Sequence, residues 1–322
     1  MKRETEMKMV ELSCMVFVNV ATMDDQMPPL QLSIEVHNGR RHADEIHKKV
    51  CKEIGMSKCS RKYFALHEGK LNPKQAYKPD DLVAFPQNSL CLQKWCFDVK
   101  SEINILFEDP VALHLLYWQA KSDIQSGKLS PTFAESQLLE DYENEANEVE
   151  YVQLCQTLKD YTSAIVRRCS LLQEYSISFY DKGSIIDLMV RDSGLKLTHI
   201  GSNNKDGDSR SENEENSNDN RHTHFIPWYL IRSWSHNRVT SSMKYEVRVH
   251  GQGFHYLIVK TDQAKYLLSL TMEMIKILQG RADNAPSFHA SMIRKDDDIT
   301  HWDNIMYDPE KTDEPFIENN NT

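Results

Sequence analysis

The residues with the most scope for chemistry stand between positions 225 and 239, where the sequence reads FIPWYLIRSWSHNRV. Under strict alternation along an extended strand, Arg232, Trp234 and His236 share one side. An indole can cover a bound tyrosine, and a guanidinium can pair with a carboxylate or a phosphate. Trp228 and Ile231, in contrast, suit the core of a sheet. The stretch therefore predicts a core anchor in its first half and a binding edge in its second half.

This binding edge is predicted at residues 232–236, where an extended peptide would add as a further strand. An edge strand leaves backbone donors and acceptors unpaired, and an extended ligand satisfies them. A helix predicted later in the chain supplies the opposite wall. The alternative is that Trp234 is a plain core residue. The predicted peptide-binding residues are Arg232, Ser233, Trp234, Ser235 and His236 on the strand, and Leu267, Leu270, Thr271 and Met274 on the helix.

Lysines and arginines gather near the start of the chain, between positions 40 and 62. Such a cluster suits contact with an anionic membrane or with a partner protein. Because acidic residues such as Asp44, Glu45 and Glu53 interleave with the cations, an ordinary solvated helix face is the alternative. The cations singled out for this contact are Arg40, Arg41, Lys48, Lys49 and Lys52.

A short motif, Asn-x-x-Tyr, occupies Asn304 to Tyr307 near the end of the chain. The asparagine favours a turn that presents the tyrosine, so this segment is a candidate linear motif for a partner or for the chain's own binding edge. Chance is the alternative, because only two positions of the motif are specified.

Patterns that suggest catalysis or metal binding lack the context they need. His222 and His224 form an H-x-H pair without a third ligand at a fixed spacing. The glycines at 251 and 253 lack the strand-to-helix setting of a phosphate-binding loop. The sequence carries no G-x-S-x-G, kinase or phosphatase signature. We therefore predict no catalytic residue, no metal site and no cofactor, and we predict that the chain is not an enzyme.

The charge of the 322-residue chain lies mainly in two segments. The formal net charge is −10, of which residues 201–224 contribute −3 and residues 282–322 contribute −7. The remainder is close to neutral, so nucleic acid is not a predicted partner. No apolar run reaches the length of a membrane span, and no signal peptide is evident. The seven cysteines form no C-x-x-C pair, which favours reduced thiols in the cytoplasm.

Three bodies position these residues, and the first spans residues 9–100. The segments VELSCMVFVNV and LQLSIEVHNG alternate as strands, and the second ends in an Asn-Gly turn. HADEIHKKVCKEIG then has apolar residues at helical spacing and a final glycine. KYFALHE and LCLQKWCFDV read as further strands. Strand, strand, helix, strand, strand is the order of a ubiquitin-like fold.

Helices are predicted to dominate the second body, residues 101–170. Asp109 is a good N-cap that precedes Pro110, and Gly127 ends the first of these helices. Ser130 is the predicted cap of the next helix, in SPTFAESQLLEDY, and EYVQLCQTL forms the third.

The third body, residues 171–281, returns to a period of two. Its antiparallel strands are interrupted by a polar, acidic loop at 202–222, which is predicted to be disordered. A final helix follows Asp262 and ends at Gly280. Strands closed by one long helix are the order of a pleckstrin-homology or phosphotyrosine-binding fold. Residues 282–322 form an acidic tail that is also predicted to be disordered.

Four stretches, taken in order, resemble a FERM domain. LLYWQAKSDIQSGKL and TFAESQLLEDY resemble its helical lobe, EYVQLCQTLKDY resembles a run ending in Leu-x-x-Tyr, and IPWYLIRSWSHN resembles a segment of its third lobe. The resemblance implies a multi-lobed α+β fold with a ubiquitin-like lobe, a helical lobe like acyl-CoA-binding protein, and a lobe like pleckstrin-homology and phosphotyrosine-binding domains.

Within that superfamily the chain looks most like the sorting nexins that pair a PX domain with a FERM domain. Those proteins bind Asn-Pro-x-Tyr or Asn-x-x-Tyr signals in receptor tails on endosomes. The resemblance implies a non-enzymatic adaptor, cytoplasmic or peripheral on endosomal or plasma membranes, with tyrosine-motif peptides as partners. The few residues before position 9 leave no room for a PX domain, so recruitment through that domain is not implied. The alternative is a scaffold that binds a folded partner or an anionic membrane through its first two lobes.

Overall fold

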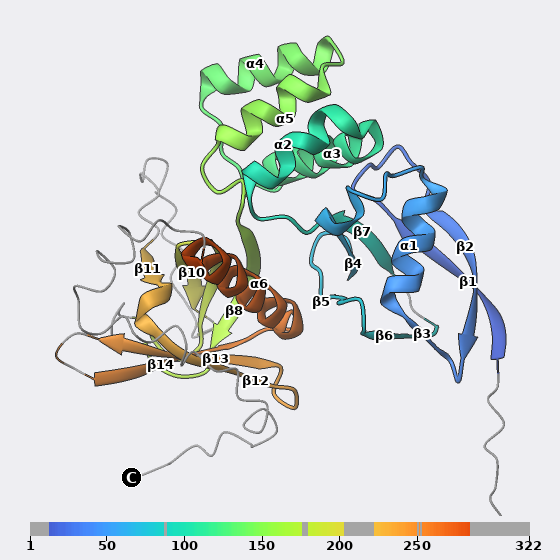
Figure 1. Ribbon diagram of the computed structural model, residues 1–322. Helices are drawn as coiled ribbons and strands as arrows, with labels where there is room; N and C mark the ends of the chain where they lie inside the picture. The colour runs from blue at the N-terminus through green and yellow to red at the C-terminus, as the bar shows by residue number, and fades with distance from the viewer. Residues whose placement is uncertain are drawn as a thin grey trace, which may run out of the picture. The chain divides into compact units, whose positions relative to one another are not determined.

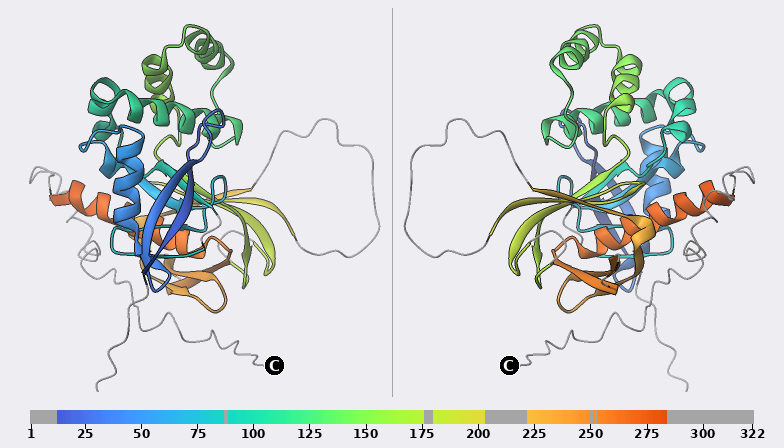
Figure 2. Two further views of the ribbon diagram at one scale, coloured as in Figure 1. Left: turned by 90° about the vertical axis from the view of Figure 1, so that its right-hand side faces the viewer. Right: turned by 90° about the vertical axis from the view of Figure 1, so that its left-hand side faces the viewer.

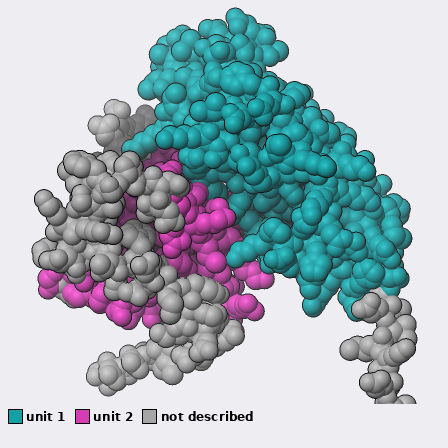
Figure 3. Space-filling view, viewed as in Figure 1, with its two compact units in different colours: residues 1–159 teal, residues 160–322 magenta. Residues whose placement is uncertain are grey.

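The computed structural model describes residues 13–86, 89–175, 180–202, 222–249, 251 and 253–283. Most of the predicted acidic loop and nearly all of the predicted acidic tail lie outside these residues. The chain divides into two compact units, residues 1–159 and 160–322 (Figure 3).

Unit 1 begins with a mixed sheet whose strand order is β5-β4-β7-β1-β2-β3-β6 (Figure 1). Helix α1 (Ala43–Glu53) packs on it through Ala43, Ile46 and Val50, which are all buried. The predicted helix and the four predicted strands of this region are all present. The strands are β1 (Ser13–Ala21), β2 (Leu30–His37), β3 (Arg40–His42), β4 (Phe64–Glu68), β5 (Gln75–Ala76), β6 (Leu82–Ala84) and β7 (Leu90–Lys94).

Helices α2 (Val99–Glu108), α3 (Pro110–Gln125), α4 (Phe133–Asn144) and α5 (Glu148–Thr157) complete unit 1. The predicted cap Asp109 is confirmed, because its side chain accepts hydrogen bonds from the first turn of α3. The predicted cap Ser130 is wrong. Helix α4 begins after Thr132, whose hydroxyl and backbone form a reciprocal capping box with Glu135. Such a box satisfies two otherwise orphaned backbone donors, which Ser130 cannot do from outside the helix.

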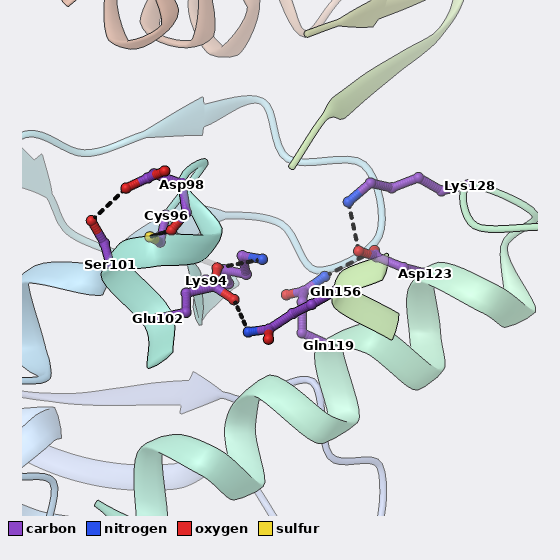
Figure 4. A network of polar contacts seen from close by, with 9 residues as sticks. All are labelled: Lys94, Cys96, Asp98, Ser101, Glu102, Gln119, Asp123, Lys128 and Gln156. Atoms are coloured by element: carbon purple, nitrogen blue, oxygen red, sulfur yellow. Dashed lines mark hydrogen bonds and ion pairs between the residues drawn. The ribbon is translucent and has the colours of Figure 1, made fainter. Parts of the chain in front are cut away.

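A buried ion pair joins the sheet of unit 1 to its helices (Figure 4). Lys94 Nζ at the end of β7 lies 2.6 Å from Glu102 Oε1 on α2, and the glutamate is fully buried. Gln156 of α5 donates to the other carboxylate oxygen at 3.1 Å. Because a buried charge without a partner costs several kcal/mol, this contact selects one arrangement of β7, α2 and α5.

Unit 2 is a seven-stranded antiparallel sheet of order β11-β10-β9-β8-β14-β13-β12. The sheet is strongly curved (Figure 2), and the long helix α6 (Ala264–Asp283) crosses one of its faces. Its strands are β8 (Ala164–Leu171), β9 (Ser184–Val190), β10 (Gly194–Ser202), β11 (Thr223–Pro227), β12 (Ile231–Asn237), β13 (Ser242–Val249) and β14 (Gly253–Lys260).

Two details of unit 2 differ from the sequence predictions. The predicted boundary near residue 170 falls inside β8, where the pairing with β9 shifts register between Val166 and Cys169 and Arg168 has a φ of 54°. That irregularity interrupts the alternation of inward and outward residues along β8, so the sequence pattern does not show one continuous strand there. Helix α6 also continues past Gly280 to Asp283, since a glycine lowers helix propensity without forcing an end.

Candidate functional site

Strand β12 is the last strand at one end of the unit 2 sheet, and β13 is its only neighbour within the part of the chain that is described. Residues 232–236 therefore lie on a terminal strand of the sheet, and the addition of a peptide there stays a prediction. In an antiparallel strand, alternate residues direct their backbone N–H and C=O groups away from the neighbouring strand. β12 thus has a side on which another extended segment can form hydrogen bonds.

The prediction that Arg232 shares a side with Trp234 and His236 is wrong. Ile231 pairs with Val247, and Ser233 pairs with Glu246, so Arg232 is an extra residue in a bulge. A bulge displaces the alternation by one position. Trp234 and His236 are buried on the core face, whereas Arg232 is exposed.

Trp234 is mostly buried, with 5% of its surface exposed, yet its indole Nε1 has no hydrogen-bond partner among the described residues. Trp228, which precedes β12, makes a useful contrast. It is equally buried, but its Nε1 donates to the backbone oxygen of Arg191 at 2.8 Å. The sequence prediction that Trp228 anchors the core is confirmed. An unsatisfied buried donor costs about 1–3 kcal/mol, so Trp234 carries a hydrogen-bonding capacity that the fold leaves unused.

On the opposite face of the sheet, cations alternate with aromatic rings. The Arg232 guanidinium lies 4.8 Å from the ring of Phe254 and 3.4 Å from a Glu246 oxygen. Lys244 Nζ lies 3.8 Å from the ring of Tyr256. The Ser233 hydroxyl also donates to Glu246, at 2.8 Å.

Sequence reasoning did not select Glu246, Phe254 or Tyr256 as neighbours of Arg232. The alternation in MKYEVRV and GFHYLIV indicates that Glu246, Phe254 and Tyr256 lie on the outward faces of two strands. Only the pairing of those strands shows that they lie near Arg232 of β12.

The four predicted wall residues of α6 belong to the core. Leu267, Leu270, Thr271 and Met274 have no exposed surface. The hydroxyl of Thr271 donates to the backbone oxygen of Leu267 and lies 2.8 Å from the hydroxyl of Tyr245 on β13. Burial raises the pKa of Tyr245, so that hydroxyl stays protonated. The prediction of an open wall here is wrong, because an amphipathic helix that crosses a sheet buries its whole apolar stripe.

The last two predicted residues of β12, Ser235 and His236, lie on opposite faces of the sheet. Ser235 lies opposite Lys244 and is partly exposed, whereas His236 lies opposite Met243 and is 4% exposed. A ligand strand beside β12 would therefore meet the backbone and the serines directly. It would reach Trp234 and His236 only along their edges.

Three cations of the basic cluster have partners within unit 1. Arg41 pairs with Glu45, and Lys48 Nζ lies 2.5 Å from Asp44. Lys49 donates to the backbone oxygen of Ser33. Arg40 lies on β3 and Lys52 in the last turn of α1, and both are exposed. The Lys48–Asp44 pair has the i, i+4 spacing of an ordinary solvated helix face, and the Arg41–Glu45 pair joins β3 to the first turn of α1.

The other predicted features give no site. Asn304 and Tyr307 lie outside the described residues. His224 packs against Tyr175 with ring centroids 5.9 Å apart, and burial lowers its pKa. Within the described ranges, no group of three histidine, cysteine, aspartate or glutamate residues could hold a metal ion. No helix in those ranges is long and apolar enough to cross a membrane.

Solved structures resemble this chain even though its sequence matches no protein-family model and no curated protein. The structure of mutant 1 of the MyTH4-FERM MF2 domain of myosin VII from Dictyostelium discoideum has a TM-score of 0.53 at 9% identity. The match covers 81% of this chain and 60% of that chain. The structure of the same MF2 domain without the mutant designation has a TM-score of 0.45 at 9% identity and covers 80% of this chain and 57% of that one.

The first of these likenesses, together with the element order, shows the class of fold. The chain has a mixed α+β, multi-lobed architecture like that of a FERM domain. No finding supports the narrower resemblance to sorting nexins, which stays a prediction.

Proposed function

We propose that this chain is a non-enzymatic adaptor whose unit 2 binds tyrosine-containing peptides by strand addition. The ligands would be Asn-Pro-x-Tyr or Asn-x-x-Tyr motifs in the cytoplasmic tails of membrane receptors, in endosomal trafficking or membrane-linked signalling. The observation that carries the proposal is the terminal strand β12, in which the buried N–H of Trp234 has no acceptor among the described residues.

Strand addition follows from the backbone of β12. An added peptide strand hydrogen-bonds to backbone groups on the outer side of β12, and these bonds supply affinity with little dependence on sequence. Specificity has to come from side chains near the edge. Ser233, Ser235 and the guanidinium of Arg232 offer polar contacts on the outer face, and the Arg232 side chain is 48% exposed, so it can also reach an acidic ligand residue.

Trp234 gives the ligand a specific anchor. In the free protein this buried N–H is desolvated without a hydrogen bond, which is unfavourable. A ligand oxygen that accepts from it would relieve that penalty and so favour binding. Since only 5% of Trp234 is exposed, we expect the ring to shift slightly at the edge when the ligand docks. The unused donor makes β12 a better candidate for ligand binding than β11 at the other end of the sheet.

Two matched tryptophan substitutions test this assignment. Trp234→Phe keeps most of the ring volume but removes the unpaired N–H, whereas Trp228→Phe removes an N–H that already has an acceptor. Calorimetric titration with a fluorescein-labelled Asn-Pro-x-Tyr peptide should show a loss of about 3- to 10-fold in affinity for Trp234→Phe. Trp228→Phe should keep the affinity of the wild type and lose about 1–2 kcal/mol of stability instead.

Absence of peptide binding by the wild-type chain would contradict the proposed function. Equal affinities for Trp234→Phe and the wild type would contradict the role of the indole. The alternative scaffold role through the first two lobes has weaker support, because Arg41, Lys48 and Lys49 already have partners within unit 1.

A further inference from the structure

Within the described part of the chain, the first half of strand β1 has a neighbour on one side only. β2 pairs along β1 from Ser13 to Val20, but β7 pairs only with Val20 and Ala21. Among the described residues, Ser13 to Asn19 therefore has an open backbone edge. Figure 1 shows this half of β1 extending past the shorter strands of the sheet.

This open segment is apolar and uncharged, which is unusual for an exposed edge. Met15 and Phe17 are 62% and 74% exposed on its outer face, and the sequence Ser13–Ala21 is SCMVFVNVA. Natural edge strands usually carry lysines, prolines or other devices that prevent pairing. Here such devices are missing from the strand itself, so the edge favours a partner strand.

The segment is complementary to itself. Antiparallel pairing of Ser13 to Asn19 with a second copy, centred on Val16, matches every residue of the open stretch. In that register Met15 lies opposite the other copy's residue 17, Cys14 lies opposite residue 18, and Ser13 lies opposite residue 19. Directly opposed residues share a face of the sheet, so the exposed methionine and phenylalanine cover one another. No charge in the segment faces a like charge.

We propose that β1 is a homodimer interface, in which two copies of this chain join their sheets through Ser13 to Asn19 about a two-fold axis at Val16. Isologous contacts of this kind use the same patch on both subunits and close without further growth. Such a dimer presents two β12 edges, so it would hold two peptide ligands at once.

Disulfide trapping tests the register. In a Cys14→Ser background, Val16→Cys brings two thiols to directly opposed positions, where the Cα atoms lie about 4.5–5.5 Å apart and a disulfide can form. Asn19→Cys is the control, because six residue positions separate its two copies by about 20 Å. Under mild oxidation of the full chain, we expect crosslinked dimer for Val16→Cys and little for Asn19→Cys. Equal crosslinking of both variants, or none, would overturn the register.

Sedimentation velocity tests the interface without an engineered thiol. The wild-type chain should sediment with twice the monomer mass at high concentration, and Phe17→Lys should sediment as a monomer. Phe133→Lys is the matched control, because Phe133 is 80% exposed at the start of α4, away from β1, and its dimer should persist. Both phenylalanines are exposed, so both variants should fold, which circular dichroism verifies. A monomeric wild type, or a dimeric Phe17→Lys chain, would contradict the proposal.

Discussion

At the scale of single residues, His114 on α3 links pH to the packing of unit 1. Its Nδ1 lies 2.6 Å from a Glu148 oxygen on α5, and its Nε2 lies 3.2 Å from an Asp24 oxygen after β1. Burial alone would lower its pKa, but the hydrogen bonds to these two carboxylates outweigh burial and raise it. When it is protonated, the imidazole can therefore join three segments that are far apart in the sequence.

A raised folded-state pKa fixes the sign of the pH effect. The contacts of His114 contribute fully below the ordinary histidine pKa and are lost as pH rises through the folded-state pKa. We predict that His114→Gln reduces the free energy of unfolding more at pH 6 than at pH 8, as measured by urea denaturation. His67, whose pKa burial lowers to about 4, acts in the opposite direction but is present in both proteins and cancels in the difference. A difference that does not change with pH would contradict this role.

Residue types near the candidate site could be predicted from the sequence, but their orientation could not. Trp228 was correctly placed in the core because an indole flanked by apolar residues is a strong burial signal. Arg232 was placed on the wrong side, because a bulge adds one residue without a local sequence signature. The unpaired N–H of Trp234 depends on which acceptors surround it in three dimensions, and no local pattern shows this.

At the scale of elements, the start of α3 is joined to the loop that follows α1. Asp109 accepts from the backbone of Val111 and Ala112 through one oxygen, and from the backbone N–H of Ser57 at 2.8 Å through the other. Burial would raise its pKa, but hydrogen bonds from Ser60, Ala112 and Ser57 lower it. The carboxylate therefore stays charged, caps α3 and binds the loop after α1.

Removal of this carboxylate should uncap α3 and leave the Ser57 N–H unsatisfied. We predict that Asp109→Ala reduces the free energy of unfolding by about 3 kcal/mol, as measured by urea denaturation. Asp109→Asn should lose about half as much, because its amide oxygen still caps the helix. Ser130→Ala is the control and should change stability by less than about 0.5 kcal/mol, since Ser130 is exposed and lies outside α4. Equal losses for Asp109→Ala and Ser130→Ala would refute the assignment.

Most elements could be predicted from local periodicity, and the exceptions have local causes. The strand–strand–helix start of unit 1 and the final helix of unit 2 have apolar residues at regular spacing, and most of those residues are buried in the structure. Helix α2 was missed because it ends directly before the cap of α3, so two helices share one short stretch. The spacing predicts helix α6, but it does not distinguish a groove wall from plain core, because periodicity gives the apolar side of a helix and not what covers it.

At the scale of the whole molecule, the seven cysteines divide into two classes. All seven are free thiols, and only Cys14 and Cys59 are exposed. Burial raises the pKa of Cys51 and Cys91 to about 11 and that of Cys96, Cys155 and Cys169 to about 12. The five buried thiols are therefore both inaccessible and protonated at neutral pH, which makes them poor nucleophiles.

A thiol titration tests both units at once. With a dilute folded chain, we predict that a disulfide reagent modifies about two thiols rapidly, and that all seven react in urea. Fast reaction of four or more thiols in the folded chain would show that at least one of the two cores is open.

The central claim, that β12 receives a peptide strand, is tested most directly by amide hydrogen exchange with and without an Asn-Pro-x-Tyr peptide. Strand addition should slow exchange at residues 232–236, where backbone groups gain partners. β11, at the other end of the same sheet, serves as an internal control and should exchange at an unchanged rate. Saturating peptide that leaves β12 unprotected, or that protects both edges equally, would contradict the claim.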